Sequence, residues 1–158
     1  MSTGKELAAL FRRDLRRLAQ EVEAFPSDEA LWKVLPGVTN SAGNLVLHLE
    51  GNLREYIGRQ LGDVAYQRER PREFADKGVP QAELKTRVEK LVALIPEVLE
   101  TLPKKGWKEP AAEKIQGQKL SVRQFVMHLH GHFNYHLGQI DYLRRALTGN
   151  GARALVDL

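Results

Sequence analysis

Apolar residues recur at intervals of three and four in four separate stretches of the chain. This spacing is typical of amphipathic α-helices, and no stretch shows a convincing alternation of period two, which would indicate a strand. We therefore predict four helices, at about residues 5–25, 41–61, 80–102 and 121–147.

Capping signals agree with several of these bounds. Thr3-x-x-Glu6 and Ser121-x-x-Gln124 have the pattern of a capping box at the start of the first and last helices. Gly149 follows the last apolar position and is a typical stop signal.

Four helices of this length, each with one apolar stripe, bury those stripes most simply as a bundle. We predict an all-α fold, a four-helix bundle, with residues 1–158 as a single domain, because no internal repeat or low-complexity tract divides the chain. The connections of about 15 to 18 residues favour crossover loops, which can also cover a site at one end.

The composition excludes several classes of protein. There is no cysteine, so disulfides, thiolate zinc sites and cysteine nucleophiles are impossible. No stretch approaches the roughly 18 to 20 apolar residues that span a bilayer, and charges interrupt the N-terminal segment where a signal peptide would be apolar. We expect a soluble, cytoplasmic protein without a membrane partner.

The net charge of +4 does not favour a nucleic-acid partner. A nucleic-acid-binding protein usually concentrates basic residues on one face. Here they are spread over the chain and interleaved with acidic residues, which is typical of solvated helix faces.

Four of the five histidines lie between residues 128 and 136, in the last predicted helix. Residues four apart share one helix face, so His128 with His132, or His132 with His136, can bind one metal ion. His136 lies nearest the centre of the apolar seam and His132 lies next to it, whereas His128 and His130 lie at its flanks. A shared metal site and ordinary hydrogen-bonded core histidines both remain open on this evidence.

The fifth histidine, His48, lies in the second predicted helix beside its apolar stripe. Periodicity alone favours a histidine at the flank of the helix. Asn52 is one turn further along the same face and can hydrogen-bond a ligand, a metal-bound water or a substrate.

Three segments resemble one known family. The pattern His-x-x-x-His-x-Gly-Gln-Ile at residues 132–140 resembles the fourth-helix signature of the DinB/YfiT-like superfamily. Asn44–Ile57 resembles the second helix of that family, and Tyr66–Phe74 is similar to an uncharacterised DinB-like branch. The resemblance covers essentially the whole chain. It implies an up-up-down-down four-helix bundle that is often a homodimer.

The resemblance also implies a divalent metal bound by His48, His132 and His136. Zinc, nickel, iron and manganese all suit imidazole ligands, and three ligands leave a coordination position open. Asn52, Gln139 and Tyr135 are candidates to support the site or contact a substrate. No catalytic residue is assigned, and His128 and His130 lie outside the implied ligand set.

The resemblance also implies an activity, because some members of the DinB/YfiT-like superfamily are enzymes. Some are S-transferases or isomerases that use a low-molecular-weight thiol such as bacillithiol or mycothiol, and others are stress-associated or uncharacterised. We expect a metal-dependent enzyme that acts on a small molecule, either as a thiol S-transferase or as a hydrolase. The alternative is a non-enzymatic, stress-associated metal-binding bundle.

The long second loop contains three arginines, Arg68, Arg70 and Arg72, around Pro71. They can form a clamp for an anionic substrate, since arginine binds carboxylate and phosphate groups strongly. The simpler interpretation is a solvated loop with ion pairs to Glu69 and Glu73.

Overall fold

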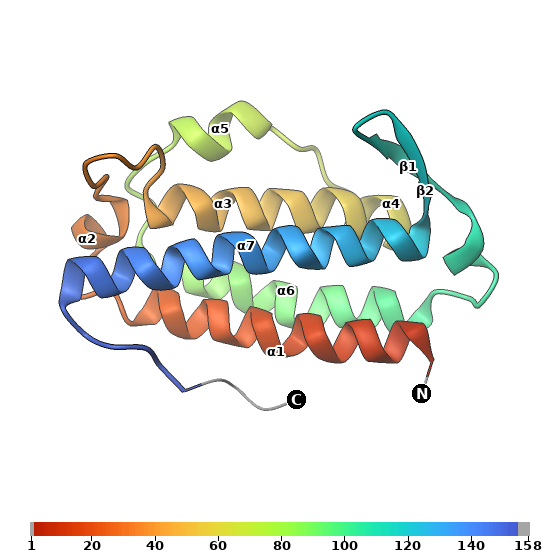
Figure 1. Cartoon of the computed structure of the whole chain (residues 1–158), viewed down its shortest axis with the longest axis horizontal. Coiled ribbons are helices and arrows are strands. Elements are labelled where there is room, and N and C mark those ends of the chain that lie inside the picture. Colours follow the sequence, from red (N-terminus) through yellow and green to blue (C-terminus); the bar gives the residue numbers. More distant parts are fainter. Residues whose placement is uncertain (1, 155–158) are drawn as a thin grey trace.

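Four long helices lie side by side in the computed structural model, which describes residues 2–154 (Figure 1). They are α1 (Thr3–Glu23), α3 (Ala42–Leu53), α6 (Gln81–Thr101) and α7 (Val122–Thr148), and α3 continues through the π-helix η1 (Arg54–Arg59) into α4 (Gln60–Gly62). The connections contain α2 (Asp28–Trp32), α5 (Arg70–Ala75), the 3₁₀-helix η2 (Gly106–Lys108) and the strands β1 (Pro110–Ile115) and β2 (Gln118–Ser121). None of the described helices has the length and hydropathy to cross a membrane. The predicted all-α four-helix bundle is confirmed.

The four long helices run up, down, down and up. Arg12 pairs with Glu100 and Glu23 with Lys85, so α1 and α6 are antiparallel. In Figure 1, α3 and α6 run in one direction, and α1 and α7 run in the other. This order differs from the up-up-down-down order that the resemblance implied.

The connections explain the order. The connection 24–41 and the connection 102–121 each stay at one end of the bundle, so each reverses the chain (Figure 1). The connection 63–80 instead returns along the length of the bundle, with α5 in its middle, so that α6 starts at the same end as α3. Within residues 2–154 there is therefore one crossover connection, whereas the sequence favoured several.

Every residue of α3 is buried, because α3 is covered on its outer side as well as its inner side. It packs against α6 and α7 inward, while α5 lies across its outer surface (Figure 1). Gly43 and Gly51 allow this close cover, since a Cβ atom on either would overlap the Trp32 ring or the Glu73 carboxylate. Polar residues on α3 consequently need partners within the protein.

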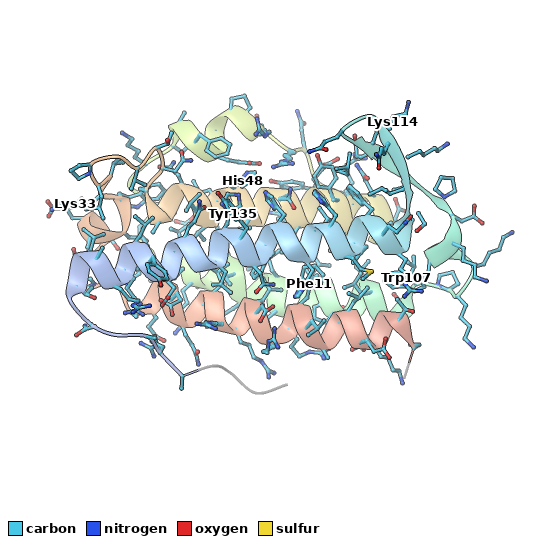
Figure 2. All side chains as sticks on the ribbon, in the orientation of Figure 1. Phe11, Lys33, His48, Trp107, Lys114 and Tyr135 are labelled. Carbon is cyan, nitrogen blue, oxygen red and sulfur yellow. The ribbon has the colours of Figure 1, made fainter. Side chains whose placement is uncertain are left out.

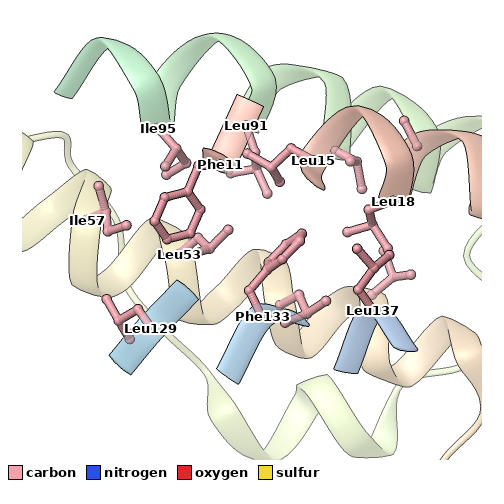
Figure 3. Close-up of a cluster of buried hydrophobic side chains, with 14 of the residues drawn as sticks. Phe11, Leu15, Leu18, Leu53, Ile57, Leu91, Ile95, Leu129, Phe133 and Leu137 are labelled. Atoms are coloured by element: carbon pink, nitrogen blue, oxygen red, sulfur yellow. The ribbon is translucent and has the colours of Figure 1, made fainter. Parts of the chain in front are cut away.

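The hydrophobic core lies between all four long helices (Figure 3). Phe11, Leu53, Ile95 and Phe133, one from each helix, are fully buried there. Burial of one such side chain stabilises the fold by about 1.5–3 kcal/mol. The apolar stripes predicted from the sequence are the surfaces that meet in this core.

Local signals agree with the structure at α7 and differ at the start of α1 and in the connection before α7. The Ser121 and Gln124 capping box is present, and Gly149 ends α7 in the left-handed conformation. Ser2, and not Thr3, caps α1. The β1–β2 hairpin was not predicted, because its strands are too short for a clear alternation; a turn at Gln116 and Gly117, both with positive φ, connects them.

A buried ion-pair network joins α7 to α1. The Arg144 side chain is 2% exposed and pairs with Glu21, which is fully buried, and with Asp141 at 3.0 Å. Breaking a buried pair leaves an uncompensated charge, which costs far more than the loss of a surface pair.

We expect Arg144→Met to lower the free energy of unfolding by about 3–5 kcal/mol, because Glu21 would remain buried without its cation. The matched control is Arg145→Met, on the next residue and 36% exposed, which should cost less than about 1 kcal/mol. Urea denaturation followed by circular dichroism measures both. Equal losses of unfolding free energy in the two variants would contradict the role given to the buried Arg144–Glu21 ion pair.

Candidate metal centre

Three histidines from two facing helices meet at one point. His48 of α3 and His132 and His136 of α7 each offer a ring nitrogen, and these atoms lie within 4.8 Å of one another. The Nε2 atoms of His48 and His132 are 3.1 Å apart. Figure 2 shows the position of His48 on α3, opposite Tyr135 on α7.

The geometry of α7 directs its two histidines toward α3. Leu129, Phe133 and Leu137 fill the core face of α7 (Figure 3). His132 and His136 are one turn apart at the edge of that face, half-buried, with ring centroids 4.6 Å apart. His48 lies in the middle of α3 and is 6% exposed. The three rings therefore meet between the core and the α5 cover.

Glu73 of α5 fixes the orientation of the His48 ring. His48 Nδ1 lies 2.8 Å from Glu73 Oε2, and Arg68 Nε donates to Glu73 Oε1 at 2.7 Å. Burial raises the pKa of Glu73, but the hydrogen bonds from His48 and Arg68 outweigh it and hold the pKa below its usual value. The carboxylate thus accepts the Nδ1–H of His48, which leaves Nε2 facing His132.

The sequence places Glu73 through two small features of α3. A Cβ atom on Gly51 would lie 2.2 Å from Glu73 Oε1, so only glycine lets the carboxylate approach the helix here. Asn44 Nδ2 donates to the carbonyl oxygens of Glu73 and Asp76, at 3.1 and 2.9 Å. These contacts hold α5 against α3 at the position of His48.

Gln139 orients the second histidine of α7. Its Oε1 accepts a hydrogen bond from His136 Nδ1 at 2.6 Å, which leaves Nε2 of His136 with its lone pair. The Nδ1 atom of His132 is buried and has no hydrogen-bond partner among the described residues. A buried polar atom without a partner is unusual and points to a functional position.

The electrostatics of the cluster favour neutral imidazoles at the two α7 histidines, His132 and His136. Burial, and then the neighbouring His136 and His48, lower the pKa of His132 to about 4. Burial is also the main cause that lowers the pKa of His136. A metal ion requires an unprotonated nitrogen, at about 2.0–2.1 Å for zinc. Nitrogens 3.1 Å apart suit two ligands of one such ion, so the residues present fit a divalent metal.

Other candidate residues lie around this cluster. The Tyr135 ring is 66% exposed and stands 5.1 Å from the His136 ring, centroid to centroid. Asn52 is buried one turn after His48, and its Oδ1 has no hydrogen-bond partner within residues 2–154. Gln139 alone of the three predicted supporting residues hydrogen-bonds a histidine of the cluster.

The remaining α7 histidines lie outside the cluster. His128 is exposed. His130 faces α1, where its Nε2 lies 2.9 Å from Asp14 Oδ2. Asn134 also donates to this carboxylate, at 2.9 Å. His130 therefore takes part in packing between α1 and α7.

The three loop arginines have separate partners. Arg68 is held by Glu73, Arg72 by Glu69 and Asp76, and the Arg70 guanidinium lies 5.3 Å from the Phe74 ring centroid. The ion pairs of the simpler interpretation are present and no joint clamp forms, but the side chains of Arg68 and Glu73 are largely buried and not solvated.

The role of Glu73 was not predicted, because the sequence offered it only as a loop ion-pair partner. Its place against His48 depends on how the connection 63–80 folds over α3, and no periodicity encodes that. The available signal was its position in the segment Tyr66–Phe74, which carries part of the family resemblance.

The profile of the mycothiol-S-transferase family matches residues 6–149 of this chain. The chain belongs to this family. A crystal structure of a DinB-like protein from Bacillus cereus ATCC 10987 is similar in fold, with a TM-score of 0.66 and 17% sequence identity over 89% of this chain and 91% of that chain. The resemblance to the DinB/YfiT-like superfamily is thereby confirmed. A search of curated proteins finds no significant match.

We expect Glu73→Gln to weaken binding of a divalent metal about 10- to 100-fold, because a neutral amide has only one acceptor oxygen for both His48 and Arg68 and holds the His48 ring less firmly than the carboxylate does. The matched control, Glu69→Gln, removes a carboxylate that pairs only with Arg72 on the surface and should leave the affinity unchanged. Competition with a chromogenic chelator measures both affinities. Equal affinities in the Glu73 variant and the unmodified protein would contradict the role given to Glu73.

The metal-free protein should lose stability in mild acid. The unfolded chain protonates a histidine near pH 6.5, whereas folded His132 does so only near pH 4. Between these values the unfolded state binds more protons, so the free energy of unfolding falls as the pH drops from about 6.5 to 4.

Urea titrations in the presence of a chelator measure this dependence. His132→Gln should make it shallower over that range, whereas His128→Gln, at an exposed position, should not. An unchanged slope in His132→Gln would rule out His132 as the cause.

Proposed function

We propose that this protein is a metal-dependent thiol S-transferase. The observation that carries the proposal is the three-histidine cluster of His48, His132 and His136, in a chain that belongs to the mycothiol-S-transferase family. The thiol substrate would be a low-molecular-weight thiol, with mycothiol as the first candidate. The second substrate would be a small electrophile.

The chemistry of the donor set supports this assignment. His48, His132 and His136 would hold the metal through neutral imidazoles, with no carboxylate among the ligands. A divalent ion with only neutral ligands keeps its full charge, and it lowers the pKa of a bound thiol so that thiolate forms near neutral pH. Three ligands also leave room for an exogenous group, as in catalytic sites.

The surrounding residues keep the donor atoms in place. Glu73 accepts the Nδ1–H of His48, and Gln139 accepts the Nδ1–H of His136, so both rings present Nε2 to the cluster. Arg68 balances the charge of Glu73, which prevents that carboxylate from remaining buried as an unpaired anion.

In the transfer, the thiolate sulfur forms a bond to the electrophilic carbon of the second substrate. The bond from that carbon to its leaving group breaks, and the leaving group departs with the electron pair. The thiol proton passes to solvent. The products are a thioether, the leaving-group anion and a proton, so no oxidant or reductant is needed.

The test combines metal analysis with an activity assay on untagged protein. We expect one divalent metal per chain, and metal-dependent conjugation of mycothiol to 1-chloro-2,4-dinitrobenzene above the uncatalysed rate. His48→Gln and His132→Gln should each lower kcat/KM at least 100-fold and also lose metal, because each removes a ligand.

His128→Gln is the matched control on the same helix and should retain metal and activity. Circular dichroism verifies that all variants are folded. Metal binding without conjugation of mycothiol, glutathione, cysteine or bacillithiol would overturn the transferase assignment and favour a non-enzymatic metal-binding bundle. Absence of metal binding on titration would overturn the metal centre itself.

A further inference from the structure

A groove runs along α7 next to His136, between α7 and the loop that precedes α3. Its walls are the loop between α2 and α3, with Leu35 and Val38, and the C-terminal half of α7, with Tyr135, Tyr142 and Ala146. Its volume is about 580 Å³, within the range of small-molecule sites. His136, one of the three cluster histidines, and its hydrogen-bond partner Gln139 line the groove as well, so the groove lies beside the histidine cluster.

The lining of this groove carries no charged side chain. By contrast, a second cavity, over the Arg68 and Arg70 loop, is lined by five charged residues, namely Glu55, Arg59, Arg68, Arg70 and Glu113. An uncharged wall offers no opposite charge to an anionic or cationic ligand, which would lose hydration there without an ion pair to compensate. The groove therefore suits an apolar, uncharged molecule.

The side chains around the groove are more exposed than their apolar character favours. Tyr135 and Tyr142 are 66% and 69% exposed, and Val38 is 37% exposed. Exposed apolar groups that gather in one place mark binding surfaces. Two tyrosine rings at the rim also favour a flat aromatic ligand, since aromatic rings attract one another beyond the gain from burial.

We propose that this groove binds the electrophilic co-substrate, and that this substrate is an uncharged apolar molecule, preferably with an aromatic ring. The inference rests on the proposed S-transferase function, because that function requires a second substrate beside the histidine cluster. The groove places such a molecule against His136, whereas a polar thiol gains little from its walls.

The test uses Val38→Asp, which introduces a charge into the groove at an exposed loop position. The matched control is Val34→Asp, on the same loop and 46% exposed but outside the lining. With 1-chloro-2,4-dinitrobenzene as substrate, Val38→Asp should raise its KM at least tenfold and leave the KM for mycothiol and the metal content unchanged. Val34→Asp should change none of these values.

A binding experiment separates this inference from the proposed function. We expect 1,3-dinitrobenzene, an unreactive analogue, to shift the NMR signals of Val38, Tyr135 and Tyr142 in the unmodified protein. Val38→Asp should weaken this binding at least tenfold even if the protein proves to have no transferase activity. Activity together with equal KM values in both Asp variants would overturn the groove assignment and leave the proposed function intact.

Two further results would also overturn the assignment. One is a shift of signals around Arg68 and Arg70 instead of the groove. The other is a dimer in solution that buries Tyr135 and Tyr142, as measured by sedimentation and by protection of these rings from solvent. In that case a second copy of the chain, and not a substrate, covers the groove.

Discussion

The structure of the site depends on one buried carboxylate. Glu73 lies between His48 and Arg68, directly over Gly51, and is 6% exposed. Burial of a carboxylate is costly unless its charge is paired and its oxygens accept hydrogen bonds. Both oxygens of Glu73 are satisfied in this way, and the same contacts hold α5 against α3. One interaction therefore fixes the cover of the bundle and the orientation of a histidine in the cluster.

This arrangement makes the site a product of the crossover connection. In a simple bundle, the outer face of α3 would meet solvent, and His48 could lie at its flank with a freely turning ring. The connection 63–80 instead returns over α3 and buries it completely. His48 then lies between two packed layers, with Glu73 on one nitrogen and the α7 histidines near the other. The connection that sets the helix order thus also supplies the orienting group.

Sequence patterns predicted what depends on local geometry. Apolar spacing of three and four predicted the long helices. Spacing of four on α7 offered two histidine pairs, and the position of the apolar seam favoured His132 and His136. Periodicity placed His48 only at a flank, and the family resemblance was needed to connect it with α7. The hairpin and the π-helix were not predicted, since both depend on short or irregular backbone. The role of Glu73 and the helix order depend on the path of one connection, which leaves no periodic signal in the chain.

The surroundings of the histidine cluster differ in charge, and this difference bears on how the two substrates of the proposed transferase would share the site. On the α5 side, Glu73 and Arg68 form a fixed ion pair, so that side orients ligands and is not free to bind more. At α7, His136 and Gln139 border an uncharged groove. A reaction between a polar thiol and an apolar electrophile needs two unlike surfaces that meet at one point. In this fold α7 and the loop before α3 supply the apolar surface, while the charged residues Arg68 and Glu73 belong to the crossover connection 63–80.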